Sequence, residues 1–599
     1  MANQYDPLTE EPNQRLLETK DSENIVKIYL EWNNIECGFR SKNDSRQILK
    51  GMTGFARPGE FLAIMGTSGS GKTIFLNALT GAVRNSSRIS LSGEILANKQ
   101  SIYDINFYKY IGYVTQDDIL LDMLTVRESV TFAARLKNVG SDDQKIAKVD
   151  SVLTELGLMK CQHTLIGNEA VKGVSGGEKK RVCIAIELIT TPSVLFLDEP
   201  TSGLDSFTSY NVIEILNQQA AKGRTVISTI HQPSSDIFKN FDKLMLICDG
   251  TIVYHGNAKD AVDYFNAREY PCPALSNPAD YFMEILHVDN AENRSEKEVN
   301  KVNFLMKAHE EVRVKLVECS EEKLETGSRG YISSYPVQIY HCTKRAVLIS
   351  VRDPKLTIFK LVILLFVALL MSILFWRIDG DTDITSQNNR NGSFFFALIT
   401  LVYANLNATI LNFPLMRAVF LKESRAKMYG TTAFYLAKNI ADFLIEVFTS
   451  IMFGLCIYWT IGYNTSSSDK PIIFLVICVL ANMCGTSLGL TAGAWFTRVD
   501  VAASLGAIMS LPFYYYSGFL RPVDSIPIAF RWLSYISPFR WVFFSLMLNE
   551  YKDSDRNKGG VLEEYNIHGT VGESICWLIV VLIGFRLLAF VGLKLNSRI

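Results

Sequence analysis

The sequence lacks the signs of several common protein classes. Its 60 Lys and Arg residues balance 61 Asp and Glu residues, so a net charge of −1 gives no indication of a nucleic-acid surface. The eleven cysteines form no Cys-x-x-Cys pair, which favours neither a zinc site nor a disulfide framework. The first 24 residues are polar, without the basic-then-apolar pattern of a cleaved signal peptide. We therefore expect no nucleic-acid partner, and expect an internal segment to direct any membrane insertion.

What the chain has is an uneven distribution of its apolar residues, which make up 48% of 599. In residues 25–287, short β-rich runs alternate with helical patterns, which predicts an α/β domain. Residues 288–357 are expected to form a charged connector and a connecting helix. Apolar stretches dominate residues 358–599. Residues 1–24 are expected to be a disordered N-terminus.

A glycine-rich loop follows a short apolar run in the α/β part. The run Phe61–Met65 predicts a buried parallel strand, and a helix is expected to begin at Lys72. Such a strand–loop–helix context is what a phosphate-binding loop requires. Its glycines let backbone N–H groups face phosphate oxygens, Lys72 reaches the β and γ phosphates, and the Thr73 hydroxyl completes a Mg²⁺ shell. The predicted ATP-binding loop is Gly66, Thr67, Ser68, Gly69, Ser70, Gly71, Lys72 and Thr73.

Two carboxylates follow a second apolar run. Residues 194–197 predict a buried strand that delivers Asp198 and Glu199 to the carboxyl edge of the sheet, where open α/β sheets bind ligands. Asp198 is expected to hold Mg²⁺, and Glu199 to polarise the water that attacks the γ-phosphate. Alone, such a pair would more often be a helix N-cap and its neighbour, but the phosphate loop upstream favours the catalytic interpretation.

Between these motifs lies Val174-Ser175-Gly176-Gly177-Glu178, and the three together in this order resemble the ATP-binding cassette ATPases. The resemblance identifies Gln116 as the residue that senses Mg²⁺ and couples to the membrane domain. It identifies His231 as the histidine that contacts the γ-phosphate. It also implies that Ser175, Gly176, Gly177 and Glu178 clamp the nucleotide held by a partner's loop, and that Asp205 lies at the dimer interface.

Adenine stacking is the contact that this resemblance leaves open. Many cassettes stack adenine on an aromatic residue near the first strand. Trp32 and Phe39 are the candidates here, and neither matches a firm motif.

Six apolar stretches near the roughly 20 residues that a bilayer span needs follow the connector. They cover about 358–376, 394–413, 442–461, 471–493, 501–519 and 574–593. The expected fold is thus an α/β cassette ATPase domain, a P-loop NTPase, followed by an all-α six-helix transmembrane domain. The segment 520–573 is expected to be a long external loop with helices that dip back into the membrane.

The positive residues of the membrane part predict its orientation. Five Lys or Arg residues lie in the loop 414–441, whereas the two short loops 377–393 and 462–470 together hold three. By the positive-inside rule, the ATPase domain and both termini are cytoplasmic. The sequons at Asn391 and Asn464 then lie outside, and either could be glycosylated or unused.

The order of the domains, ATPase first, is typical of the G or White subfamily of half-transporters. Asn277–Phe282, Arg352-Asp353-Pro354 and the loop Arg417–Tyr429 carry this resemblance, which extends over residues 25–599. It implies an ATP- and Mg²⁺-dependent exporter in the lipid bilayer, acting as a homo- or heterodimer with a second half-transporter chain. The substrate class is a lipid, sterol or other amphipathic small molecule. The alternative is an ATP-gated channel or regulatory subunit, which the intact catalytic residues disfavour.

Overall fold

The computed structural model describes most of the chain. The described residues are 25–40, 45–83, 85–86, 89–168, 170–273, 276–287, 304–307, 323–326, 330–378, 383–496, 498–557 and 560–596. The N-terminus 1–24 and most of the segment 288–333 therefore lie outside the described residues. The chain forms two compact units, Met1–Asp117 with Gly176–Arg329, and Asp118–Ser175 with Gly330–Ile599.

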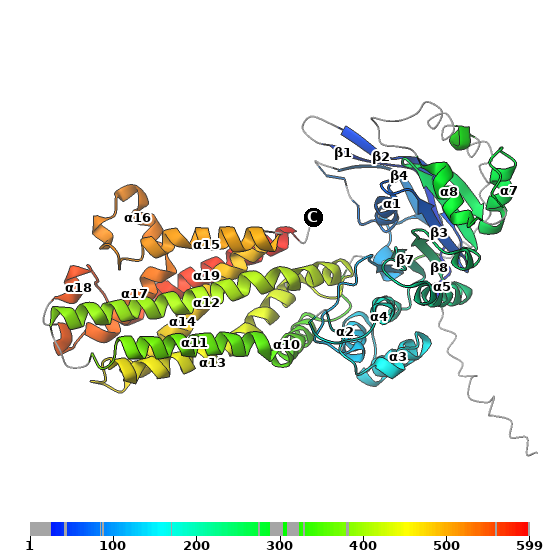
Figure 1. Cartoon of the computed structure of the whole chain (residues 1–599). Coiled ribbons are helices and arrows are strands. Elements are labelled where there is room, and N and C mark those ends of the chain that lie inside the picture. Colours follow the sequence, from blue (N-terminus) through cyan, green and yellow to red (C-terminus); the bar gives the residue numbers. More distant parts are fainter. Residues whose placement is uncertain are drawn as a thin grey trace, which may run out of the picture. The chain divides into compact units, whose positions relative to one another are not determined.

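The first unit contains two β-sheets and the helices that pack on them (Figure 1). A six-stranded sheet has the order β10-β9-β3-β8-β7-β6 and is parallel except for β10 at its edge. A four-stranded antiparallel sheet has the order β2-β1-β4-β5. The strands are β1 (Leu30–Arg40), β2 (Ser45–Ala56), β3 (Phe61–Gly66), β4 (Ile89–Ala97), β5 (Gln100–Ser101), β6 (Ile111–Val114), β7 (Val194–Asp198), β8 (Thr225–Thr229), β9 (Lys243–Cys248) and β10 (Thr251–Asn257).

The helices of this unit follow the strands. They are α1 (Lys72–Leu79), α4 (Gly176–Leu188), α5 (Ser206–Ala221), α6 (Ser235–Phe238), α7 (Ala261–Asn266) and α8 (Pro278–Leu286). Every residue of β3, β7 and β8 is buried, as expected for a parallel sheet covered on both faces. The predicted strand, loop and helix around the glycine motif are confirmed as β3 and α1. Because β3 and β7 run parallel, their carboxyl ends bring Lys72 and Asp198 to one edge of the sheet.

The second unit is helical, with long helices side by side (Figure 1). Its helices are α2 (Val126–Lys137), α3 (Asp142–Glu155), α10 (Tyr335–Arg352), α11 (Pro354–Leu374), α12 (Ile384–Arg425), α13 (Thr431–Ile461), α14 (Asp469–Trp495), α15 (Val499–Tyr515), α16 (Ile528–Tyr535), α17 (Pro538–Tyr551), α18 (Val561–Glu564) and α19 (Val571–Asn596).

Five of these helices, α11, α12, α13, α14 and α19, are long and apolar enough to cross a membrane. The fifth predicted span corresponds to α15, which is apolar but has only 17 residues. It ends at Tyr515 because a turn with Gly518 at φ 93° follows, so this helix is shorter than the predicted stretch 501–519. The helix α12, with 42 residues, extends well beyond its predicted span at both ends.

The segment 520–573 folds back onto the bundle as α16, α17 and α18. Every residue of α17 is buried, and this helix packs against α14 and α19. At its carboxyl end, the buried Glu550 accepts a hydrogen bond from the backbone N–H of Asn464 (2.9 Å) and forms ion pairs with Arg390 (3.4 Å) and Arg556. Buried ionic contacts thus hold this end of the bundle together. The segment between Cys484 and Cys576, which includes Glu550 and Arg556, contains no cysteine that could form a disulfide there.

Both sequon asparagines are buried in the folded chain. The Asn391 side chain accepts a hydrogen bond from the Tyr551 hydroxyl (2.8 Å), and the Asn464 amide donates to the Glu550 carbonyl (2.8 Å). Neither amide faces solvent, so the fold gives no room for a glycan at either position.

Candidate active site

The glycine-rich loop between β3 and α1 has the shape of a phosphate cradle. Gly69 has a φ of 80°, a left-handed conformation that other residues rarely adopt, and a Cβ there would meet no atom within 4 Å. The open space on this side of the loop is what a phosphate group needs. Ser70 Oγ is buried and, among the described residues, has no hydrogen-bond partner.

Backbone carbonyl groups of the loop hold the side chain of Lys72 in place. Its Nζ donates to the carbonyl oxygens of Gly66 (2.8 Å) and Thr67 (3.2 Å). Burial lowers the pKa of Lys72, while the nearby carboxylates of Glu199 and Asp198 raise it in part. A partly desolvated ammonium facing two carboxylates is suited to bind the phosphate oxygens of a nucleotide.

The carboxyl end of β7 presents the two predicted acids. Asp198 Oδ1 accepts hydrogen bonds from the hydroxyls of Thr229 (2.6 Å) and Thr73 (3.3 Å). Glu199 has a φ of 44°, and its backbone N–H donates to Thr229 Oγ1 (2.8 Å). Residues other than glycine rarely adopt this left-handed conformation, and such backbone strain is common at active sites.

Gln116 reaches the same place from the end of β6. Its Nε2 donates to Glu199 Oε2 at 2.8 Å, and its backbone carbonyl accepts from Lys180 Nζ at 2.7 Å. Lys180 belongs to α4 and is almost fully buried, so its hydrogen bond fixes the backbone of Gln116 to that helix. Lys180 and Thr229 support the site without a recognisable sequence signal, because their contacts follow only from the packing of α4 and β8.

The remaining predicted residues occupy different surroundings. His231 follows β8 and is exposed. Asp205 is the N-cap of α5, where its carboxylate accepts hydrogen bonds from the Thr208 backbone N–H (3.0 Å) and hydroxyl (2.7 Å). Ser175 is exposed at the end of a segment of the second unit, and Gly176 begins α4 in the first.

The two glycines at the start of α4 differ in what surrounds them. A Cβ on Gly177 would lie 2.0 Å from Thr208 Cγ2, so any larger residue would require the Thr208 side chain on α5 to move. A Cβ on Gly176 would come no closer than 3.5 Å to Leu204. Packing therefore requires Gly177, whereas Gly176 is exposed and available to a ligand.

One of the two adenine-stacking candidates is wrong. Trp32 is 0% exposed, because it is enclosed between the His255 ring (6.1 Å between centroids) and the Phe75 ring (5.5 Å). A buried core side chain cannot stack on a ligand. Phe39, at the end of β1, is 43% exposed and remains available.

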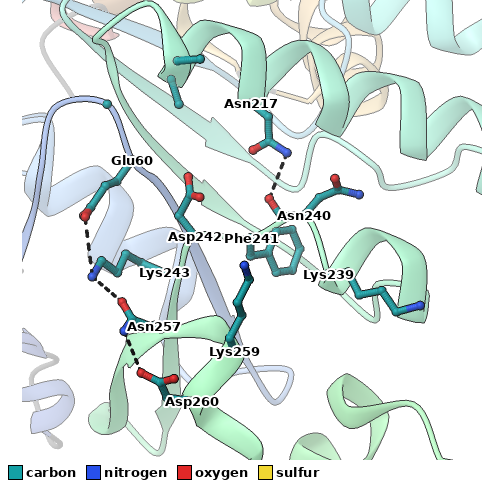
Figure 2. A pocket seen from close by; sticks show the side chains of 13 residues that line it. Glu60, Asn217, Lys239, Asn240, Phe241, Asp242, Lys243, Asn257, Lys259 and Asp260 are labelled. Carbon is teal, nitrogen blue, oxygen red and sulfur yellow. Dashed lines mark hydrogen bonds and ion pairs between the residues drawn. The ribbon is translucent and has the colours of Figure 1, made fainter.

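A separate polar hollow of about 630 Å³ lies at the opposite edge of the six-stranded sheet (Figure 2). Glu60 and Lys243, which line it, stand at the amino ends of β3 and β9. Lys243 Nζ pairs with Glu60 (3.6 Å) and donates to Asn257 (2.7 Å), as the dashed lines in Figure 2 show. Because the phosphate loop follows the carboxyl end of β3, this hollow is distinct from the nucleotide site.

The second unit contains a charged cluster that joins α2, α10 and the end of α12. The Arg345 guanidinium donates to both carboxylate oxygens of Glu423 (2.6 and 2.8 Å) and to the Tyr429 hydroxyl (3.0 Å). It also lies 3.7 Å from the centre of the Phe132 ring. Burial opposes the charge, but the Glu423 carboxylate keeps the pKa of Arg345 above its ordinary value.

A second arginine of α10 contacts the start of α2. Arg352 donates to both oxygens of Glu128 (2.5 and 2.7 Å). Burial raises the pKa of the Glu128 carboxyl, but the hydrogen bonds from Arg352 and Thr125 outweigh it and the pKa is lowered. The segment 118–175, which lies between Gln116 and Gly176 in the sequence, is thus attached to α10 by Arg345 and Arg352.

This combination of a phosphate loop, paired acids and a helical membrane domain defines an ATP-binding transport protein. The family described as ABC transporter matches residues 49–202, and two families described as ABC-2 type transporter match residues 337–551 and 231–323. The fold is a cassette ATPase domain followed by a helical transmembrane domain, as predicted. The protein is a multi-pass membrane protein and an ATPase coupled to transport.

Comparison with similar proteins identifies the family of the chain more narrowly. It is 33% identical to "Protein white" of Drosophila melanogaster, over 92% of this chain and 84% of that protein. It is also 33% identical to "ABC transporter G family member 7" of Arabidopsis thaliana (89% and 76%) and to "ABC transporter ATP-binding protein/permease wht-1" of Caenorhabditis elegans (85% and 78%). The chain belongs to the ABC transporter G family of half-transporters.

Proposed function

We propose that the protein is an ATP-hydrolysing exporter that works as a dimer on a lipid, sterol or other amphipathic substrate. The observation that carries the catalytic part is the hydrogen bond between Gln116 Nε2 and Glu199 Oε2 (2.8 Å), at the edge where Lys72 and Asp198 also lie. Glu199 orients and polarises the attacking water, Lys72 binds the β and γ phosphates, and His231 contacts the γ-phosphate. Phosphoryl transfer requires little more than such positioning and charge.

Oxygen donors in this site suit Mg²⁺. Thr73 Oγ1 lies 3.3 Å from Asp198 Oδ1, and hydroxyl, carboxylate and amide oxygens are the ligands that this hard cation prefers. Thr73, Asp198 and Gln116 would hold the ion. When bound, Mg²⁺ neutralises charge on the phosphate oxygens.

The dimer is proposed because one chain has one phosphate loop and one Ser175–Glu178 motif. In two chains, the Ser175, Gly176 and Glu178 of one would close on the nucleotide held by the other, a helix N-terminus being a favourable anion site. Asp205, at the N-cap of α5, would lie near the same interface. Binding energy of two nucleotides would then close the cassettes, and the contacts of Arg345 and Arg352 would carry the movement to the membrane helices.

Mixing two inactive variants tests the shared sites. Lys72→Met removes the phosphate contact, and Ser175→Arg blocks the clamping motif. Co-expressed chains that carry one change each should recover partial ATP hydrolysis, since some dimers retain one site with two intact halves. Each variant expressed alone is the control. Mixtures as inactive as the single variants would contradict the shared sites.

Transport itself is tested in vesicles. ATP-dependent movement and substrate-stimulated hydrolysis should be measured over a panel of sterols, phospholipids and amphipathic drugs. An ATP-gated channel would instead show conductance that nucleotide binding opens without uphill movement. The complete set Lys72, Asp198, Glu199 and His231 favours pumping.

We also propose that the ATPase domain and both termini are cytoplasmic. A cysteine placed at the exposed Ser467 should react with an impermeant thiol reagent on intact cells, whereas one at Ser424 should react only after permeabilisation. The exposed Cys456 and Cys576 must first be replaced. Labelling of position 424 in intact cells would reverse the orientation and the direction of export.

A further inference from the structure

The connection between α16 and α17 contains a buried arginine with no acidic partner. Arg540, in the first turn of α17, is 8% exposed. Its Nη1 donates to the Ser534 hydroxyl (2.7 Å), and its Nε has no acceptor. Within the part of the chain that the structure describes, no Asp or Glu oxygen lies within ion-pair distance of Arg540, whereas Arg531 nearby pairs with Asp524 (3.7 Å).

Aromatic rings make up the rest of the Arg540 environment. The guanidinium carbon lies 4.3 Å from the centre of the Tyr535 ring and 4.9 Å from those of Trp541 and Phe544. The faces of such rings attract a cation. An arginine remains charged even when buried, and a buried charge without a counter-ion is costly. Asp524 acts on Arg540 only beyond ion-pair distance and the Tyr535 hydroxyl is neutral, so among the described residues no anion contacts the guanidinium directly.

The aromatic residues around Arg540 indicate the depth at which this anion lies. Trp532, Tyr535 and Trp577 are 59%, 51% and 54% exposed, and Trp577 stacks on Trp541 with 5.6 Å between centroids. Exposed Trp and Tyr side chains gather at the membrane–water interface, at the level of the lipid headgroups. The short helix α16 also exposes the apolar Ile528, as an interfacial helix does.

We propose that Arg540 binds the phosphate of a phospholipid in the outer leaflet, with its acyl chains along the exposed Trp577 face of α19. That this lipid lies in the outer leaflet rests on the proposed function, which places the ATPase domain and both termini in the cytoplasm. Guanidinium binds phosphate through two parallel N–H groups, and Nε is the buried Arg540 donor that has no acceptor among the described residues. Trp541 and Phe544 exclude water from the pair and so strengthen it.

The experiment titrates the purified full-length protein in detergent with phosphatidylcholine and follows thermal unfolding. Diacylglycerol with the same acyl chains and inorganic phosphate serve as separate probes. Phosphatidylcholine should raise the Tm of the wild type, and the other two should not. For Arg540→Gln, the phosphatidylcholine affinity should fall about tenfold or more, since a charged hydrogen bond is lost.

Two further variants separate binding from folding. Arg540→Lys keeps the charge but loses the planar fork, so its affinity should lie between those of the wild type and Arg540→Gln. Arg531→Gln, on the same segment but paired with Asp524, should bind like the wild type. Equal stabilisation by diacylglycerol or by inorganic phosphate, or an unchanged affinity in Arg540→Gln, would overturn the proposal.

ATP hydrolysis is measured on the same samples. A wild-type protein that binds phosphatidylcholine through Arg540 but does not hydrolyse ATP would contradict the exporter and leave the lipid site standing. Access to the site is read with an impermeant quencher and a headgroup-labelled lipid in sealed vesicles. Quenching only from the cassette side would contradict the outer-leaflet position.

Discussion

The two units of the molecule use charged side chains in opposite ways. In the nucleotide site, Lys72, Asp198 and Glu199 come from short motifs and lie at an edge of the sheet that remains open to a ligand. In the helical unit, the buried Arg345 and the largely covered Glu423 satisfy each other across elements far apart in the sequence. The first arrangement is prepared for a partner outside the chain, and the second holds the chain together. Changes in the first should therefore alter chemistry at constant stability, and changes in the second should do the reverse.

The largest effect is expected at the nucleotide site. Glu199→Gln should bind ATP but hydrolyse it about 100- to 10,000-fold more slowly, because the amide cannot accept a proton from the attacking water. Thermal unfolding should be unchanged. Phosphate release and nucleotide binding are measured, with Glu214→Gln, an exposed position on α5, as the matched control. Near wild-type hydrolysis would remove Glu199 from the mechanism.

A charge removed from the helical unit should act on stability. Arg345→Met leaves the largely covered Glu423 without its arginine partner and should destabilise the protein by about 2–4 kcal/mol. Removing both charges in Arg345→Met with Glu423→Met should recover much of this loss, since no unpaired charge remains. Thermal unfolding in detergent compares the stability of the single and the double variant with that of the wild type. A double variant as unstable as the single one would show that the pair stabilises through its geometry rather than its charge.

A smaller effect is expected at the two glycines of α4, of which Gly177 should affect stability and Gly176 should affect ATP hydrolysis. Gly177→Ala should destabilise the first unit by about 1–3 kcal/mol, because its methyl group would overlap Thr208 Cγ2. Thr208→Ser removes that methyl and should restore stability. Gly176→Ala, with free space around it, should leave thermal unfolding unchanged but reduce ATP hydrolysis. Equal stability losses in both alanine variants would contradict this division.

The smallest effect is expected at the half-exposed pair between Arg352 and Glu128. Because the pKa of Glu128 is lowered in the folded protein, the pair stabilises above the ordinary value of 4.5 and is lost as the pH falls through the folded value. The difference in Tm between wild type and Glu128→Gln should correspond to about 1 kcal/mol or less near pH 7 and vanish once the pH lies below the pKa of Glu128 in the folded protein. Gln keeps the helix cap with Thr125, so the comparison isolates the charge. A difference independent of pH would rule out the ionic contribution.

Local patterns were enough to predict the strand, loop and helix around the glycine motif and most of the helices of the membrane part. A phosphate loop requires a strand before it and a helix after it, and residues 61–79 supply both within one short segment. Apolar stretches likewise identified the helices of the membrane part, since a span is defined by its own length and hydropathy. The length of α15 was missed, because a turn around Gly518 ends it before the apolar stretch does.

Local sequence patterns could not predict contacts between segments that are distant in the sequence. Trp32 looked available for adenine, yet its position in β1 places it in the core against His255. The sequons at Asn391 and Asn464 fit a pattern for external sites, but both side chains are hydrogen-bonded inside the bundle. Lys180 gave no signal beyond a basic run, and only the packing of α4 brings it to the Gln116 carbonyl.

The amino-acid sequence alone predicts the strand, loop and helix around the glycine motif and the membrane-spanning character of the second half. Both depend on residues that are neighbours along the chain, so their backbone geometry and their partition between water and lipid follow from local composition. The three-dimensional fold was needed to show that residues 118–175 contact α10 and that Arg345 meets Glu423. It also decided that Arg540 is buried among aromatic rings without an acid, because burial and pairing depend on which distant segments the fold brings together.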